Sequence, residues 1–230
     1  LLDEQALLEG IRAFLKTSLA GLNEDDRALF YFAGHGVALD GDDGPEGFIV
    51  AQNANRSGTD GFMPMAELRE ILSSIPCRHS LVILDCCFAG AFRWSATRHL
   101  GFSRGPLHKE RYEWYIKDQA WQVITSASHN QRALDVVAGD ALGNRGDGSS
   151  SHSPFATALL DALRGQADTR GKSGGRNGCV TATEIYIYIR ERLETSNARI
   201  HQTPGLWHLP KHQGGEFVFL TPGAKLALDP

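Results

Sequence analysis

Apolar and polar residues form two kinds of pattern along this chain, and each pattern predicts a different type of secondary structure. Residues 3–20 carry apolar side chains at every third or fourth position, which predicts an amphipathic helix. Residues 28–34 and 79–87 are short, nearly unbroken apolar runs, which are typical of buried strands. Further short strands are expected at residues 48–52, 121–128 and 215–220.

Local helix signals lie between these strands. Residues 64–75 have a helical pattern, with Pro64 suited to the first turn. Ser153 followed by Pro154 predicts the start of a helix that runs through residue 163 and ends at a glycine. Thr181, with Glu184 three positions later, forms a capping box and predicts a helix to about residue 193. Loops are expected at residues 38–47, 91–118 and 139–153.

Strands separated by helices predict an α/β domain with a mostly parallel sheet and helices on both faces. We expect one domain over residues 1–230. In such sheets the reactive crevice lies beyond the carboxyl ends of the strands.

The composition narrows the class of protein. The 230 residues are 42% hydrophobic, with a net charge of −4 and dispersed basic residues, so a nucleic-acid binder is not indicated. No apolar run approaches the ~18 residues of a membrane-spanning helix. Four cysteines are too few for a disulfide scaffold of this length, so we expect a reducing, cytoplasmic location.

Reactive side chains stand at the ends of two of the expected strands. "FYFAGHG" ends at His35 and "LVILDCC" ends at Cys87, so both residues are expected at the same edge of the sheet. An imidazole can favour the thiolate of a nearby cysteine or carry its proton. The amides of Gly36 and Cys87 are expected to face the crevice, where two N–H groups could hold an oxyanion.

These two motifs, 52 residues apart, resemble the His-Gly and Asp-x-Cys motifs of caspase-like cysteine peptidases, above all metacaspases and their bacterial relatives. The segments "VITSASHNQRALD", "HSPFATALLDAL" and "QTPG…GGEFVFL" also resemble parts of that family, so the likeness covers roughly residues 20–220. It implies a peptidase that forms an acyl-enzyme, with Cys87 as nucleophile and His35 as general acid/base. Cys86 stands where metacaspases usually have serine, and we expect it to face the core.

By position, Asp85 matches the acidic residue that receives a basic side chain in the primary specificity pocket of metacaspases. Ser126, Ser128 and Asp135 are weaker candidates for the wall of this pocket. A carboxylate pairs with Arg or Lys, so the resemblance implies cleavage of protein substrates after Arg or Lys, the P1 residue. No cofactor is required, although some metacaspases are activated by calcium.

Departures from the family pattern bear on the organisation of the domain. Family members have two strands and a helix before the strand expected at residue 28, so part of the sheet is expected to be missing from this chain. Residues 1–90 form the His- and Cys-bearing core, 91–118 a candidate processing loop, and 119–222 a part that resembles the small subunit. Flanking sensor domains, common in bacterial relatives, are expected in a longer parent chain, and no membrane or nucleic-acid partner is indicated.

Two other functions remain open at this stage. A catalytically silent caspase-like scaffold is the main alternative, and a small metal-binding domain is another. Zinc would have to use Cys77, His79, Cys86 and Cys87, which lack paired ligand spacing. Calcium would have to use Asp40, Asp42, Asp43 and Glu46, which lack the EF-hand spacing. "GKS" at residues 171–173 does not fit a phosphate loop, because the required upstream glycine is Gln166.

Overall fold

The computed structural model describes residues 1, 3–41, 44–55, 58–93, 112–128, 152–168, 176, 178–196 and 202–222. Its central sheet has four strands in the order β1-β5-β6-β8. Strands β1 (Arg27–Ala33), β5 (His79–Asp85) and β6 (Ala120–Thr125) are parallel, and β8 (Gly205–His208) runs antiparallel to β6. The predicted α/β class with a mostly parallel sheet is therefore confirmed.

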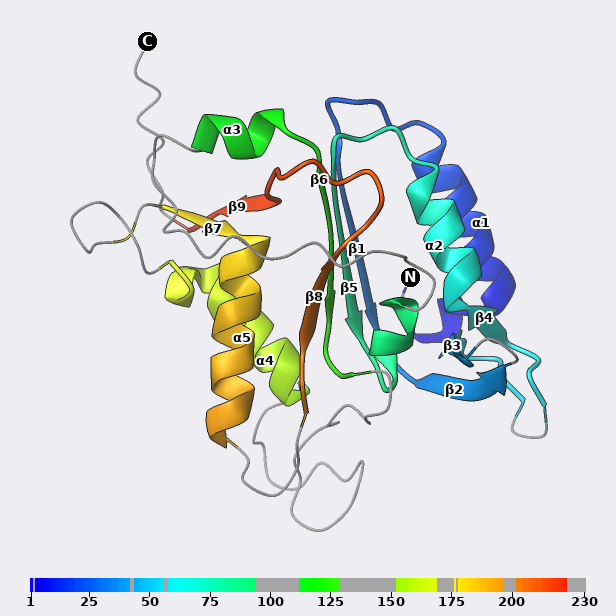
Figure 1. Cartoon of the computed structure of the whole chain (residues 1–230). Helices are drawn as coiled ribbons and strands as arrows, with labels where there is room; N and C mark the ends of the chain where they lie inside the picture. The colour runs from blue at the N-terminus through cyan, green and yellow to red at the C-terminus, as the bar shows by residue number, and fades with distance from the viewer. Residues whose placement is uncertain are drawn as a thin grey trace.

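Helices cover both faces of this sheet (Figure 1). On one face lie α1 (Leu8–Leu19), which follows a short turn η1 (Asp3–Gln5), and α2 (Met65–Ser73). On the other face lie α4 (Pro154–Asp161), which continues into a π-helical turn η4 (Ala162–Gln166), and α5 (Ala182–Ser196). The three-layer arrangement follows from the apolar stripe that each of these helices turns toward the sheet.

Strand β5 divides the core into two clusters because alternate side chains of a strand point to opposite faces. Val82 and Leu84 pack with α1 and α2, whereas Leu81 and Ile83 pack with α4 and α5. Every residue of β5 is buried, as its apolar run predicts.

Strand β1 differs from its prediction as a buried strand. It lies at an edge of the four-stranded sheet, and its residues alternate between exposed and partly buried. Leu29 and Tyr31 are 51% and 44% exposed, on the face that β5 turns toward α4 and α5. The apolar run correctly indicated a strand, but the number of neighbouring strands is not encoded in the run itself.

Two small antiparallel sheets accompany the central one. The first joins β2 (Gly36–Gly41), β3 (Gly44–Val50) and β4 (Phe62–Pro64). The prediction of a loop at residues 38–47 was therefore wrong: residues 38–41 and 44–47 pair with each other as antiparallel strands. The second joins β7 (Cys179–Thr181) and β9 (Val218–Leu220), so the predicted C-terminal strand exists but pairs outside the central sheet.

Within the region expected as a long loop, η2 (Ala89–Arg93) and α3 (Tyr112–Lys117) are helical. Residues 94–111, the middle of the candidate processing loop, lie outside the described residues. No helix among the described parts of the chain is long and apolar enough to span a membrane.

Candidate active site

The ends of β1 and β5 meet at one edge of the sheet. Ala33 is paired with Asp85 in parallel register, and the Gly34 amide donates to the Asp85 carbonyl at 3.2 Å. His35 and Cys87 each lie two residues beyond this pair, so the two chain segments leave adjacent strands side by side. This is the arrangement that the sequence predicted for the crevice.

Gly36 brings these two segments into contact. A Cβ atom at this position would clash with the carbonyl oxygen of Cys87 and would lie 3.1 Å from the Cys86 Sγ. The carbonyl of His35 accepts a hydrogen bond from the Val50 amide at 2.9 Å, which anchors this segment to β3. His35 is exposed and Cys87 is partly buried, so both residues are accessible from solvent.

The chain turns sharply after Cys87. Phe88 has a φ of 55°, in the left-handed region that side chains other than glycine rarely adopt. The turn is held by two backbone hydrogen bonds, from Ala91 to the Phe88 carbonyl at 2.8 Å and from Gly90 to the Ala127 carbonyl at 3.0 Å. Strained backbone of this kind is concentrated at functional sites because the surrounding structure must enforce it.

The two adjacent cysteines have different environments. Cys86 is 1% exposed and packs in the cluster formed with α1 and α2, which confirms that it faces the core. Burial and, secondarily, the charge of Asp85 raise the pKa of the Cys86 thiol. A buried thiol that resists ionisation is a poor nucleophile.

Asp85 points to the opposite face from Cys86 and is 7% exposed. Ser153, the N-cap residue of α4, donates its hydroxyl to Oδ2 of Asp85 at 2.6 Å. Tyr31 lies on the same face of the neighbouring strand, and its pKa is raised to about 12 by burial and then by the Asp85 charge. The structure thus places a buried carboxylate beside the segment that carries Cys87.

Ser126 lies beside the nucleophile segment and is fully buried. Its hydroxyl donates to the Cys86 carbonyl at 3.2 Å, and its amide donates to the Leu84 carbonyl at 2.9 Å. Gln202 in turn donates to the Ser126 carbonyl at 2.8 Å. Ser126 therefore supports the backbone at the end of β5, with its own hydroxyl proton directed to that backbone.

Two further residues were predicted for the pocket wall, Ser128 and Asp135. Ser128 follows β6 and is partly buried. Asp135 lies outside the described residues.

The sequence did not identify three residues near the site: Tyr31, Ser153 and Gln202. Ser153 was recognised only as a helix cap, and its hydrogen bond to Asp85 spans 68 positions. Tyr31 could have been noticed, because it precedes Ala33 by two positions and therefore shares its face. Gln202 had no local signal.

Neither metal hypothesis gains support. Among the described residues, no group of three or more His, Cys, Asp or Glu side chains could hold a metal ion. Asp42 and Asp43 of the calcium hypothesis lie outside that part of the chain.

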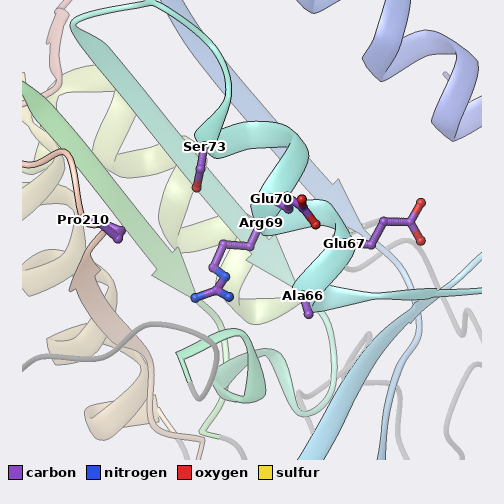
Figure 2. A pocket seen from close by; sticks show the side chains of 6 residues that line it. All are labelled: Ala66, Glu67, Arg69, Glu70, Ser73 and Pro210. Carbon is purple, nitrogen blue, oxygen red and sulfur yellow. The ribbon is translucent and has the colours of Figure 1, made fainter.

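A pocket of about 500 Å³ lies elsewhere, on α2 (Figure 2). It is lined by Ala66, Glu67, Arg69, Glu70, Ser73 and Pro210. Glu67 is already paired with Arg12, with 2.7 Å between Oε1 and Nε. None of the lining residues belongs to the predicted site.

The comparisons with known proteins agree with this fold. The family model for the caspase domain matches residues 2–212, so the chain belongs to the caspase-domain family, a family of cysteine peptidases. The fold is similar to the crystal structure of protein GSU0716 from Geobacter sulfurreducens, with a TM-score of 0.54 and 15% sequence identity over 91% of this chain and 75% of that chain. At this identity the likeness shows the fold alone. The search of curated proteins found no match.

Proposed function

We propose that this protein is a cysteine endopeptidase of the metacaspase-like branch that cuts protein chains after Arg or Lys. The observation that supports the proposal most is the parallel register of β1 and β5: His35 and Cys87 each follow the paired residues Ala33 and Asp85 by two positions, and Asp85 is buried. Family membership supports the reaction class.

The mechanism is acyl transfer. The Cys87 thiolate attacks the carbonyl carbon of the scissile peptide bond, and the amides of Gly36 and Cys87 stabilise the oxyanion that forms. His35 protonates the departing amine and later removes a proton from the water that hydrolyses the thioester. The substrate lies extended beside the strand ends and pairs through its main chain.

Asp85 accounts for the substrate preference. A carboxylate that is 7% exposed gains more from a cationic P1 side chain than from a neutral or anionic one, because the pair forms away from solvent screening. Tyr31 lies on the same face and contributes an aromatic surface next to this charge.

The test is turnover of fluorogenic peptides with P1 Arg, Lys or Asp by the wild type, Cys87→Ala, Asp85→Ala and Cys86→Ala. We expect Cys87→Ala to lose at least ~10³-fold in kcat, as is usual when a nucleophile is removed. Asp85→Ala should lose turnover of the Arg and Lys peptides. Cys86→Ala is the matched control, since it removes a thiol one position away, and should retain most activity.

Preference for the Asp peptide would overturn the assignment of Asp85 to the pocket. A silent scaffold would show no turnover and no labelling of Cys87 by a thiol-reactive peptide with P1 Arg. Labelling at Cys86 instead would overturn the choice of nucleophile.

A further inference from the structure

Ser153 joins the candidate pocket to a helix that is distant in sequence. Its hydroxyl accepts a hydrogen bond from the Ala156 amide at 2.9 Å, which caps α4. The same hydroxyl donates to Oδ2 of Asp85 at 2.6 Å. A hydroxyl has a single proton, so the acceptor role in the cap and the donor role toward Asp85 are compatible and fix the direction of the O–H bond.

The environment of Asp85 makes this donor important. The carboxylate is 7% exposed, and a buried carboxylate requires hydrogen-bond donors to remain ionised. An O–H···O⁻ contact of 2.6 Å has the length of a charge-assisted bond. The N-terminus of α4, which Ser153 caps, adds a partial positive charge on the same side.

We propose that Ser153 is a positioning residue of the P1 pocket, which fixes the orientation and the ionised state of Asp85 for a cationic substrate side chain. This inference rests on the proposed function. Ser153 acts through Asp85 and makes no contact with the reacting atoms. Because Arg and Lys must approach the carboxylate along defined directions, loss of this hydrogen bond weakens substrate binding more than the chemical step.

The competing interpretation is that Ser153 only caps α4. Substitutions at this position can separate the two roles. Ser153→Gly keeps most of the capping free energy but has no side-chain donor. Ser153→Asp caps well but places a like charge beside Asp85, and Ser153→Thr keeps both the cap and the donor.

The experiment measures kcat and KM for the P1 Arg peptide against pH, together with the melting temperature of each full-length variant. Ser153→Gly should raise KM about tenfold, the usual effect of losing a hydrogen bond to a charged group, with kcat changed less than about threefold. The acid limb of its kcat/KM profile should move to higher pH, because the ionised carboxylate has lost a donor. Ser153→Asp should lose more, and Ser153→Thr should restore wild-type values.

The effects of other titrating groups on the pH profile must be distinguished from the effect of Asp85. Tyr31 on β1 and Cys86 in the adjoining segment both sense the charge of Asp85, and each has a pKa that is raised mainly by burial. Tyr31→Phe controls for the phenol. His35 and Cys87 are unchanged in every variant, so a difference between variants does not come from a change in their identity.

Wild-type KM and an unshifted pH profile in both Ser153→Gly and Ser153→Asp would overturn the proposal and leave Ser153 as a cap. Titration of the ¹³C-labelled Asp85 carboxyl by NMR keeps the test independent of turnover. If the wild type cleaved neither the Arg nor the Lys peptide, the proposed function would fail. A higher titration midpoint in Ser153→Gly would then still support the Ser153–Asp85 link, and an unchanged midpoint would refute it.

Discussion

At residue 36 the chain has no room for a side chain, because the carbonyl oxygen of Cys87 occupies the place of a Cβ atom. Gly36→Ala should therefore push the His35 segment away from the Cys87 turn. We expect a loss of about 1–3 kcal/mol in the free energy of unfolding, as for other overpacked sites, and at least a tenfold loss in kcat/KM. Thermal melting and peptide turnover measure the two effects.

Gly21→Ala is the matched control for this substitution, because a Cβ atom at Gly21 would meet nothing within 4 Å. It should leave both stability and turnover close to the wild-type values. Equal effects of the two substitutions would show that residue 36 is not a point of close contact.

The residues of the proposed site could be predicted only where a reactive side chain stands at the end of a strand. His35, Asp85 and Cys87 stand at such ends, so the hydrophobic pattern and the parallel register place them together. The hydrogen bonds that support them, from Ser153 to Asp85 and from Gln202 to Ser126, connect residues 68 and 76 positions apart. Nothing in the local sequence fixes contacts of that range.

Helix α5 shows how a short motif determines an element. The Glu184 amide donates to Oγ1 of Thr181 at 3.2 Å, and the Thr181 amide donates to Oε2 of Glu184 at 2.9 Å, which confirms the predicted capping box. Thr181→Ala should cost about 1 kcal/mol in the free energy of unfolding. Thr17→Ala is the control: Thr17 is exposed within α1 and its hydroxyl bonds back to the Ala13 carbonyl, so its loss should be neutral or slightly stabilising. Denaturant melts of both variants test the difference.

Strand β1 presents an unpaired edge in the described sheet, with Leu29 and Tyr31 exposed on one face. Such edges favour association with other chains, and lysine suppresses it. Leu29→Lys should reduce concentration-dependent light scattering while changing the free energy of unfolding by less than about 0.5 kcal/mol. Leu81→Lys, on the same face of the buried strand β5, should instead unfold the protein. Unchanged scattering by a folded Leu29→Lys protein would show that this edge does not drive association.

The β2–β3 hairpin was not predicted from the sequence, and the reason is physical. Residues 38–47 contain three glycines and four acidic residues, which are typical of turns, yet most of them pair as the β2–β3 hairpin. Strand propensity is a weak guide there, because the strand hydrogen bonds come from partners and not from the side chains. The long buried runs were predicted correctly since burial on both faces leaves a continuous apolar signal.

For the whole molecule, two stacked histidines make stability depend on pH. His208 and His212 have ring centroids 3.6 Å apart, and the Nδ1 atom of His212 accepts a hydrogen bond from the Trp121 amide at 3.2 Å. Protonation of His212 would turn this acceptor into a second donor. Accordingly, burial, and then His208, lower the pKa of His212 to about 4.

The sign of the effect follows from that lowered pKa. The stabilising contribution of neutral His212 is complete above the unfolded value of about 6.5 and is lost as the pH falls toward 4. Acidification from pH 7.5 to 5 should cost about 1–2 kcal/mol from this group, or roughly 2–8 °C in melting temperature. Glu216, whose pKa is raised by burial, opposes this change, so variants must be compared with the wild type at both pH values.

His212→Asn isolates the histidine, because the asparagine oxygen can accept from the Trp121 amide but does not titrate. The melting temperature of this variant should fall less between pH 7.5 and pH 5 than that of the wild type. The same substitution at the exposed His152 should leave the acid sensitivity intact. Equal acid sensitivity of His212→Asn and the wild type would assign the effect to other groups.

The fold also restricts where the proposed peptidase could process itself. The candidate loop 91–118 holds six basic residues, each of which suits an acidic P1 pocket. Two of them lie in described helical elements, Arg93 in η2 and Lys117 in α3. A substrate must be extended to pair with the site, so helical segments would first have to unfold. We therefore expect cleavage after one of the other four: Arg98, Arg104, Lys109 or Arg111.

Intact-mass spectra over time, for the wild type and for Cys87→Ala, test this expectation. The wild type should yield two fragments whose masses sum to the parent plus one water, with the first ending at one of those four residues, and Cys87→Ala should stay whole. Fragments that end at Arg93 or Lys117 would contradict the argument from helical structure. An uncut wild type that still cleaves a P1 Arg peptide would show that the active site forms without processing, as expected if the register of β1 with β5 is enough to bring the segments of His35 and Cys87 together.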